Sequence, residues 1–460
     1  MKTYGQDINT SLGNAADPID ADQKLQEDAL MSYVASVNYS YDDKYYASFS
    51  FRRDGSSRLS PDTRWGNFWS LSASWRLSQE RFMQPLKSVL SDLKLRASYG
   101  VNGNLPSSYY GYQSTYTTGA FYSGKPSPWE STLGNEELTW EKNYALNLGL
   151  DIGLFSRVNV SLDWYTRTTK DLLMSKQLNS ISGFSSLLTN VGQMRNTGVE
   201  LEVRSNNIKT KDFSWTTAFN LSHNKNKILK LADLPWFVDG RYVRKEGYPF
   251  NTIYLREYAG VDPETGSALY YDNQQDENGN YTKNKVTDPG QASPIPLKDI
   301  TPTISGGFMN TFNYKFIDLS FNLSYSFGGY SYDNASYILQ DDGYSVISNK
   351  STEQRRRWQK PGDITDVPRF VYGNKKGGNY NSSRAIHSTD HIRLKSLILG
   401  LNAPKAWLQK LGIGNARIYF SGTNLLTWAA YDQYDPEMSG VVGFYTPPLK
   451  TYAFGLELKF

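Results

Sequence analysis

Apolar and polar residues alternate at every second position along most of this 460-residue chain. In the clearest segment the apolar set is Ile317, Leu319, Phe321, Leu323, Tyr325 and Phe327, and the polar set is Asp318, Ser320, Asn322, Ser324 and Ser326. Successive side chains of a β-strand point to opposite faces, so the pattern predicts strands with one apolar and one polar face. We count about thirteen such segments, and many exceed the five or six residues that are usual for soluble strands.

Short and long connections alternate between these segments. The short links are 42–43, 153–156, 206–211 and 314–316, and two further links, 78–92 and 402–415, are expected to form helical turns at a membrane surface. The long polar stretches are 54–66, 102–136, 171–194, 225–302, 329–389 and 429–449. Outer-membrane barrels have short periplasmic turns and long external loops. The pattern therefore predicts an all-β, transmembrane antiparallel β-barrel whose long loops lie outside the cell.

The last strand carries the same signal in its strongest form. Its apolar positions are Tyr452, Phe454, Leu456, Leu458 and Phe460, and the positions between them are Ala453, Gly455, Glu457 and Lys459. A soluble sheet seldom ends on an uncovered strand of this kind, whereas an outer-membrane barrel places such a face in lipid. A soluble carbohydrate-binding β-sandwich, with its polar faces in water, is the alternative.

The strand count sets an expectation for the domain organisation. Counting back from a periplasmic C-terminus, the first membrane strand, near 32–41, runs inward, so residues 1–31 are expected outside the cell. Closed bacterial barrels normally have an even number of strands and both ends in the periplasm. We therefore expect residues 32–460 to be the C-terminal part of a larger barrel, without the plug domain, and the first residues show no signal peptide.

Composition limits the chemistry. Tyrosine contributes 34 residues, aromatic residues make up 14% and hydrophobic residues 39%, which suits a sheet with an apolar outside and a wet inside. The chain has no cysteine and a formal charge of +4, so disulfides and thiolate metal sites are excluded and nothing favours nucleic acid. No run of 18 apolar residues occurs, so no transmembrane helix is predicted.

No enzymatic motif is present. The three histidines, His223, His387 and His391, do not form H-E-x-x-H, and the G-x-S-x-G, P-loop and dinucleotide patterns are absent. We therefore predict no enzyme activity, no cofactor and no metal site. The oxygen-rich run 272–280 lacks the spacing of a calcium loop and is interpreted as a solvated turn.

Two segments depart from simple alternation. The apolar positions are even-numbered at Ile392 and Leu394 but odd-numbered at Leu397, and a β-bulge near Ser396 would restore the phase. The segment 250–272 has strand character, but the strand count requires it to be an external hairpin or pair of strands.

Candidate functional residues fall into two groups. Charged residues on polar strand faces are too costly to place in lipid and are expected to face the lumen and the plug: Arg52, Arg76, Arg96, Glu200, Glu202 and Arg204. Three tryptophans in the long loops, Trp129, Trp236 and Trp358, could stack on a sugar or pack against a peptide, or else serve loop packing and contact with a partner. The segment 53–58 could contact an anion, but it is better explained as a turn in which Gly55 gives the backbone its freedom.

Several motifs resemble one family. They are the segments 51–58, 64–66, 93–100, 258–266, 392–395, 421–428, 434–437 and 452–460, which read FRRDGSSR, RWG, LKLRASYG, YAGVDPETG, IRLK, SGTNLLTW, YDPE and YAFGLELKF. In this order they are similar to the SusC/RagA-type TonB-linked outer-membrane proteins of Bacteroidetes, and the similarity runs from about residue 28 to residue 460.

This resemblance implies a 22-stranded barrel in the cell outer membrane, plugged by an N-terminal domain, that imports glycan oligosaccharides or peptides. It also implies a SusD-like lipoprotein as an external lid, energy from TonB, ExbB and ExbD, and recognition of the aromatic C-terminal strand by the outer-membrane assembly machinery. A passive porin or an adhesive barrel, without energy coupling, is the alternative within the membrane.

Overall fold

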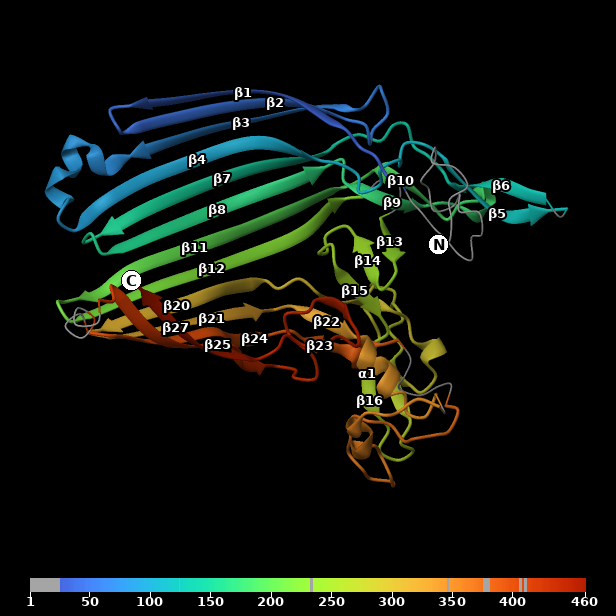
Figure 1. Ribbon diagram of the computed structural model, residues 1–460. Coiled ribbons are helices and arrows are strands. Elements are labelled where there is room, and N and C mark those ends of the chain that lie inside the picture. The colour runs from blue at the N-terminus through green and yellow to red at the C-terminus, as the bar shows by residue number, and fades with distance from the viewer. Residues whose placement is uncertain are drawn as a thin grey trace, which may run out of the picture.

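Thirteen strands form one antiparallel sheet (Figure 1) in the computed structural model, which describes residues 25–123, 125–231, 235–345, 347–374, 381–404, 408 and 412–460. We call this sheet the wall. In sheet order its strands are β1 (Leu30–Tyr41), β2 (Tyr45–Ser56), β3 (Trp65–Arg76), β4 (Leu90–Asn104), β7 (Glu141–Leu154), β8 (Val158–Lys170), β11 (Gln193–Lys209), β12 (Phe213–Lys230), β20 (Ile304–Tyr314), β21 (Ile317–Phe327), β24 (His391–Asn402), β25 (Asn415–Ala429) and β27 (Thr451–Lys459). The strand pattern of the sequence is thus confirmed.

The register of the wall separates polar from apolar residues. One row of directly paired positions, from β1 to β24, reads Ser40, Tyr46, Ser74, Arg96, Gly149, Asp163, Glu200, Ser222, Ser305, Ser326 and His391. The adjacent row, from β1 to β21, reads Tyr39, Ala47, Ala73, Ala97, Leu148, Trp164, Val199, His223, Ile304 and Phe327. Because a shift of one residue would exchange the two faces, this pattern fixes the register across the wall.

All short links lie at one end of the wall and all long loops at the other (Figure 1). We call these the short-link end and the long-loop end. Among the described residues, the short-link end carries 42–44, 77–89, 155–157, 210–212, 315–316, 403–404, 408 and 412–414. The long-loop end carries 57–64, 105–123, 125–140, 171–192, 231, 235–303, 328–345, 347–374, 381–390 and 430–450. Strands β2, β4 and β12 continue further into the loops than expected, because hydrogen-bond ladders extend past the apolar stretches.

The loops contain their own small sheets and short helices. The strands are β5 (Thr115–Tyr122), β6 (Lys125–Thr132), β9 (Leu173–Gln177), β10 (Ser186–Asn190), β13 (Trp236–Asp239), β14 (Tyr242–Lys245), β15 (Thr252–Leu255), β16 (Tyr258–Val261), β17 (Ala268–Tyr271), β18 (Lys285–Val286), β19 (Ile295–Asp299), β22 (Tyr330–Asp333), β23 (Ile386–Ser388) and β26 (Gly440–Val442). The helices are α1 (Asn334–Leu339) and the 3-10 turns η2 (Leu77–Gln79), η3 (Arg81–Leu86), η4 (Ser180–Ser182), η5 (Pro289–Gln291), η6 (Thr352–Arg356) and η7 (Ser383–Ala385).

Several local predictions can be compared with the structure directly. The bulge near Ser396 is confirmed, because Leu394 and Ser396 are consecutive partners of β21 and Lys395 is skipped. The segment 250–272 forms loop strands and no wall strand, as expected. Turns η2 and η3 confirm the helical link after β3, whereas much of the link after β24 lies outside the described residues.

Buried apolar clusters lie at the long-loop end and not in the middle of the wall. One joins Leu59, Leu138 and Trp140, and a second joins Ile253 with Tyr332. On the apolar face of the wall, which we call the outer face, large apolar side chains are exposed: Val37 is 65% exposed and Phe454 is 81% exposed. The described helices include none long and apolar enough to cross a membrane.

Strands β1 and β27 are the two edges of the wall, and no pairing among the described residues joins them. Of the expected external segment 1–31, residues 1–24 lie outside the described residues. Residues just before β1 contact the long-loop end, where Asp28 pairs with Arg58 at 2.8 Å and the Glu27 amide donates to the Tyr110 hydroxyl at 3.1 Å.

Candidate functional site

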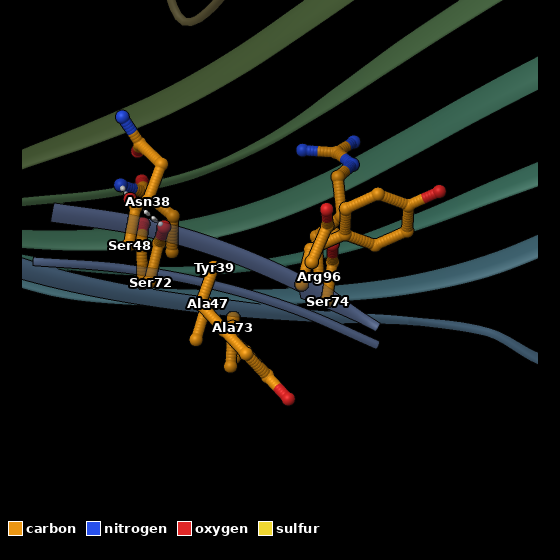
Figure 2. Close-up of a pocket in the computed structure, with 14 residues that line it drawn as sticks. Asn38, Tyr39, Ala47, Ser48, Ser72, Ala73, Ser74 and Arg96 are labelled. Carbon is orange, nitrogen blue, oxygen red and sulfur yellow. Dashed lines mark hydrogen bonds between the residues drawn. The ribbon is translucent and has the colours of Figure 1, made fainter. Parts of the chain in front are cut away.

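We call the face of the wall that carries the polar row, with Arg96 and Glu200, the inner face. Near β1 to β7 it borders a cavity of about 410 Å³. Figure 2 shows Asn38, Ser48, Ser72 and Arg96 on one side of the strands, and Tyr39, Ala47 and Ala73 on the other. The Ser48 and Ser72 hydroxyls lie 2.8 Å apart. Small hydroxyl side chains thus line this part of the polar face.

Arg96 is the centre of an ion-pair network on that face. Its Nε donates to Asp151 at 2.8 Å, and its Nη1 lies 2.9 Å from Asp163. The arginine lies over Gly149, where a Cβ would come 2.6 Å from the guanidinium carbon. One arginine thus links strands β4, β7 and β8, and a glycine gives it the space to lie flat.

Three other charged residues on the inner face pair with residues that are closer to them in sequence than the partners of Arg96 are. Arg76 pairs with Asp92 at 2.9 Å near the short-link end, Arg52 pairs with the buried Asp54 at 2.7 Å, and Arg204 pairs with Glu202. Glu200 is exposed in the polar row beside Asp163. All six predicted residues therefore occupy polar-face positions, and their contact with a plug stays a prediction.

Gly55 does not turn the chain, contrary to expectation. It lies inside β2, is not among the glycines with positive φ, and pairs with Trp65 on β3. A Cβ at Gly55 would come 2.8 Å from the Trp65 ring. The glycine is needed because the indole lies across its backbone, and this cross-strand requirement is invisible in the local sequence.

Two motifs far apart in the sequence meet at the long-loop end. Arg393 of β24 is 4% exposed and binds Asp435 at 2.8 Å and Glu437 at 2.9 Å. Lys395, the bulged residue, binds the same glutamate at 2.6 Å. The bulge places two cations of β24 against the loop that precedes β27. We call this set the latch. Local sequence patterns do not indicate that these two motifs touch.

The three candidate tryptophans have different surroundings. Trp129 on β6 is 57% exposed. Trp358 donates its indole N–H to the Pro263 carbonyl at 2.8 Å and covers Gly266, so it contributes to loop packing. Trp236 on β13 is 43% exposed and borders an external cavity beside Tyr254. The structure does not bring the three together, and a substrate role for each stays a prediction.

The described residues include no cluster of three or more histidine and acidic side chains that could hold a metal. In the oxygen-rich run, Asp276 accepts backbone N–H groups of Asn278 and Asn280 at 2.9 and 2.8 Å. These bonds lower the pKa of Asp276 and make the segment a closed turn.

Comparison with known proteins decides the family. The model described as "TonB dependent receptor-like, beta-barrel" matches residues 2–290. The chain belongs to the TonB-dependent receptor family. It is 33% identical to TonB-dependent receptor P3 of Formosa agariphila over 95% of its length, and 31% identical to TonB-dependent receptor SusC of Bacteroides thetaiotaomicron over 95%.

The wall also matches a solved structure of a transporter. The structure of the RagAB peptide transporter covers 99% of the chain with a TM-score of 0.86 and 30% identity. The chain corresponds to 46% of the P3 receptor, 45% of SusC and 50% of the RagAB chain, so it spans about half the length of these relatives.

Family membership indicates which parts of the wall face lipid, the periplasm and the outside of the cell. The protein is a SusC/RagA-type outer-membrane protein of the kind found in Bacteroidetes, and its fold is a transmembrane antiparallel β-barrel wall that is open among the described strands. The exposed outer face therefore lies in lipid, the short-link end in the periplasm and the long-loop end outside the cell. A soluble sandwich is excluded, and the relatives are receptors and transporters.

Proposed function

We propose that this chain supplies the C-terminal wall and external loops of an importer that carries oligosaccharides or peptides across the outer membrane. Its domain division would be an external segment at 1–31 and wall with loops at 32–460. The observation that carries the proposal is the concentration of every long loop at one end of a polar-lined wall. Such an end can hold a ligand above the lumen before passage.

Both ligand classes remain in the proposal. The chain is 31% identical to SusC and 30% identical to the chain of a peptide transporter, so overall similarity favours neither class. A SusD-like lipoprotein would cover the external loops, and TonB with ExbB and ExbD would supply energy. Arg52, Arg76, Arg96, Glu200, Glu202 and Arg204 would face a plug and lumen water.

Deletion of the gene tests import directly. Growth of the deletion strain on defined polysaccharides and on peptides should fail for one ligand class and return on complementation. A proton uncoupler should stop uptake by the complemented strain, because TonB coupling needs the proton gradient. Unchanged growth on every ligand would contradict import, and uptake that continues with the uncoupler would favour the passive porin.

The terminal strand would act as the assembly signal. Tyr452, Phe454, Leu456 and Leu458 lie on the outer face of β27, and Phe460, which follows the strand, is 88% exposed. Deletion of Phe460 should lower the amount of protein in the outer-membrane fraction, measured by quantitative immunoblot. Lys459→Ala, at the residue just before Phe460, is the control, and equal levels for both variants would contradict the proposal.

A further inference from the structure

An external cavity of about 480 Å³ lies beside the small sheet β13–β14–β15–β19. One face of this sheet is packed, because Ile253 and Leu255 belong to a buried apolar cluster. The opposite face carries Trp236 and Tyr254 into the cavity, with Val243 at its floor. Their rings lie 5.8 Å apart at 49°. The sheet therefore presents Trp236 and Tyr254 to the cavity on the face opposite that apolar cluster.

Three of the other residues that line the cavity carry side-chain amides. Asn273, Gln274 and Gln275 line it together with Tyr281. The turn that Asp276 closes holds this segment, since Gln275 and Tyr281 form a β-bridge across it. The oxygen-rich run 272–280, interpreted from the sequence as a solvated turn, does form a turn, and amide residues within it border the cavity.

The side chains of these amides are placed differently. Asn273 is 1% exposed, accepts from Lys283 at 3.0 Å and keeps its Nδ2 buried, so its side chain holds the segment that borders the cavity. The side-chain Nε2 of Gln274 makes only long bonds, 3.4 Å to the Gln291 carbonyl and 3.3 Å to Ser293. An amide offers both donors and acceptors, which matches vicinal hydroxyl groups.

Charge limits the ligand class further. Lys245 is the one charged side chain among the described residues that line the cavity, and none of those residues is acidic. A peptide with a free ammonium or basic side chains would find no carboxylate here. A sugar ring has an apolar C–H face for Trp236 and hydroxyl edges for the amides, and the volume is typical of small-ligand sites.

From this arrangement we infer that the cavity is an oligosaccharide-binding subsite, with Trp236 and Tyr254 as the stacking surface and Gln274 and Gln275 as hydroxyl partners. This inference rests on the proposed import function, because it specifies which ligand class the importer would capture. Binding itself requires neither TonB nor a partner lipoprotein.

The test measures binding by the purified, detergent-solubilised protein. An array of immobilised plant, algal and microbial glycans identifies bound oligosaccharides, and titration calorimetry then gives their affinities. Trp236→Ala should weaken binding about tenfold or more, since it removes the stacking surface, and Gln274→Ala should weaken it by a smaller factor. Tyr372→Ala is the matched control, because Tyr372 is 79% exposed and lies outside the cavity.

Heat-modifiable migration on gels checks that each variant is folded, and Trp236→Phe, which keeps a ring, should retain most of the affinity. The inference is overturned if no glycan binds, if only peptides bind, or if folded Trp236→Ala and Gln274→Ala bind as well as the unaltered protein. Because uptake is measured separately in cells, a failure of import with intact glycan binding would count against the proposed function alone.

Discussion

The wall and the long-loop end bury their apolar residues in opposite ways. On the wall, side chains such as Val37 and Leu456 point outward and are more than half exposed, so lipid must cover them. At the long-loop end, Leu59 and Leu138 are fully buried against neighbouring loops. The wall is therefore held by strand pairing and the membrane, whereas the loops are packed like a small soluble domain. Substitutions should have different consequences in the two regions.

The largest effect is expected at the latch, where the two regions meet. Arg393→Leu leaves Asp435, whose side chain is 5% exposed, without its main partner, and should reduce the free energy of unfolding by about 3–5 kcal/mol. Arg204→Leu, at an exposed pair with Glu202, should cost less than about 1 kcal/mol. Urea unfolding in lipid vesicles measures both, and equal costs would contradict a structural role for the latch.

Cavity formation should distinguish the loop core from the lipid-facing surface. Leu138→Ala removes a side chain that is 0% exposed beside Trp140, and should cost about 2–5 kcal/mol. Leu456→Ala, at a position that is 62% exposed on β27, should cost much less, because lipid fills the vacated space. Thermal unfolding of the two variants compares them, and a larger loss at Leu456 would reverse the interpretation.

Within the wall, two consecutive exposed residues test the assignment of faces. Leu148→Arg places a charge in lipid and should cost about 2–4 kcal/mol, whereas Asn147→Arg places it in the lumen at little cost. The amount of folded protein in the outer membrane provides the measurement. If Asn147→Arg proved the more damaging of the two, the faces would be assigned wrongly.

The smallest effect concerns pH in the external loops. Burial raises the pKa of Asp299, so this carboxyl disfavours the folded state once the pH rises from the ordinary value of about 3.9 through its raised pKa. Asp299→Asn should therefore raise the melting temperature at pH 7 and lose this advantage below about pH 4.

Asp262 is the control with the opposite sign. A hydrogen bond from Thr265 lowers the pKa of Asp262, so its stabilisation is present at neutral pH and is lost as the pH falls through the lowered value. Asp262→Asn should lower the melting temperature at pH 7. A common pH response of both variants would contradict the difference in their surroundings.

Local reasoning predicts the strands of the wall but not the contacts of the candidate site residues. Alternation along one strand identifies its two faces, and Arg96 and Glu200 lie in the polar row of paired positions. The same reasoning could not find Asp163 as the partner of Arg96, because the two are 67 residues apart in sequence. The turn predicted at Gly55 is wrong for a related reason, since the constraint on this glycine comes from Trp65 on the next strand.

The sequence by itself determined the strands, their two faces, the alternation of short and long links and the aromatic terminal strand, because each follows from a period of two or from local polarity. Only the tertiary structure decided which charged residues pair, how the latch joins β24 to the last loop, and that Trp236 borders an open cavity while Trp358 packs on Gly266. Those outcomes depend on contacts between segments that are distant in sequence, and residue order alone does not reveal which of them meet.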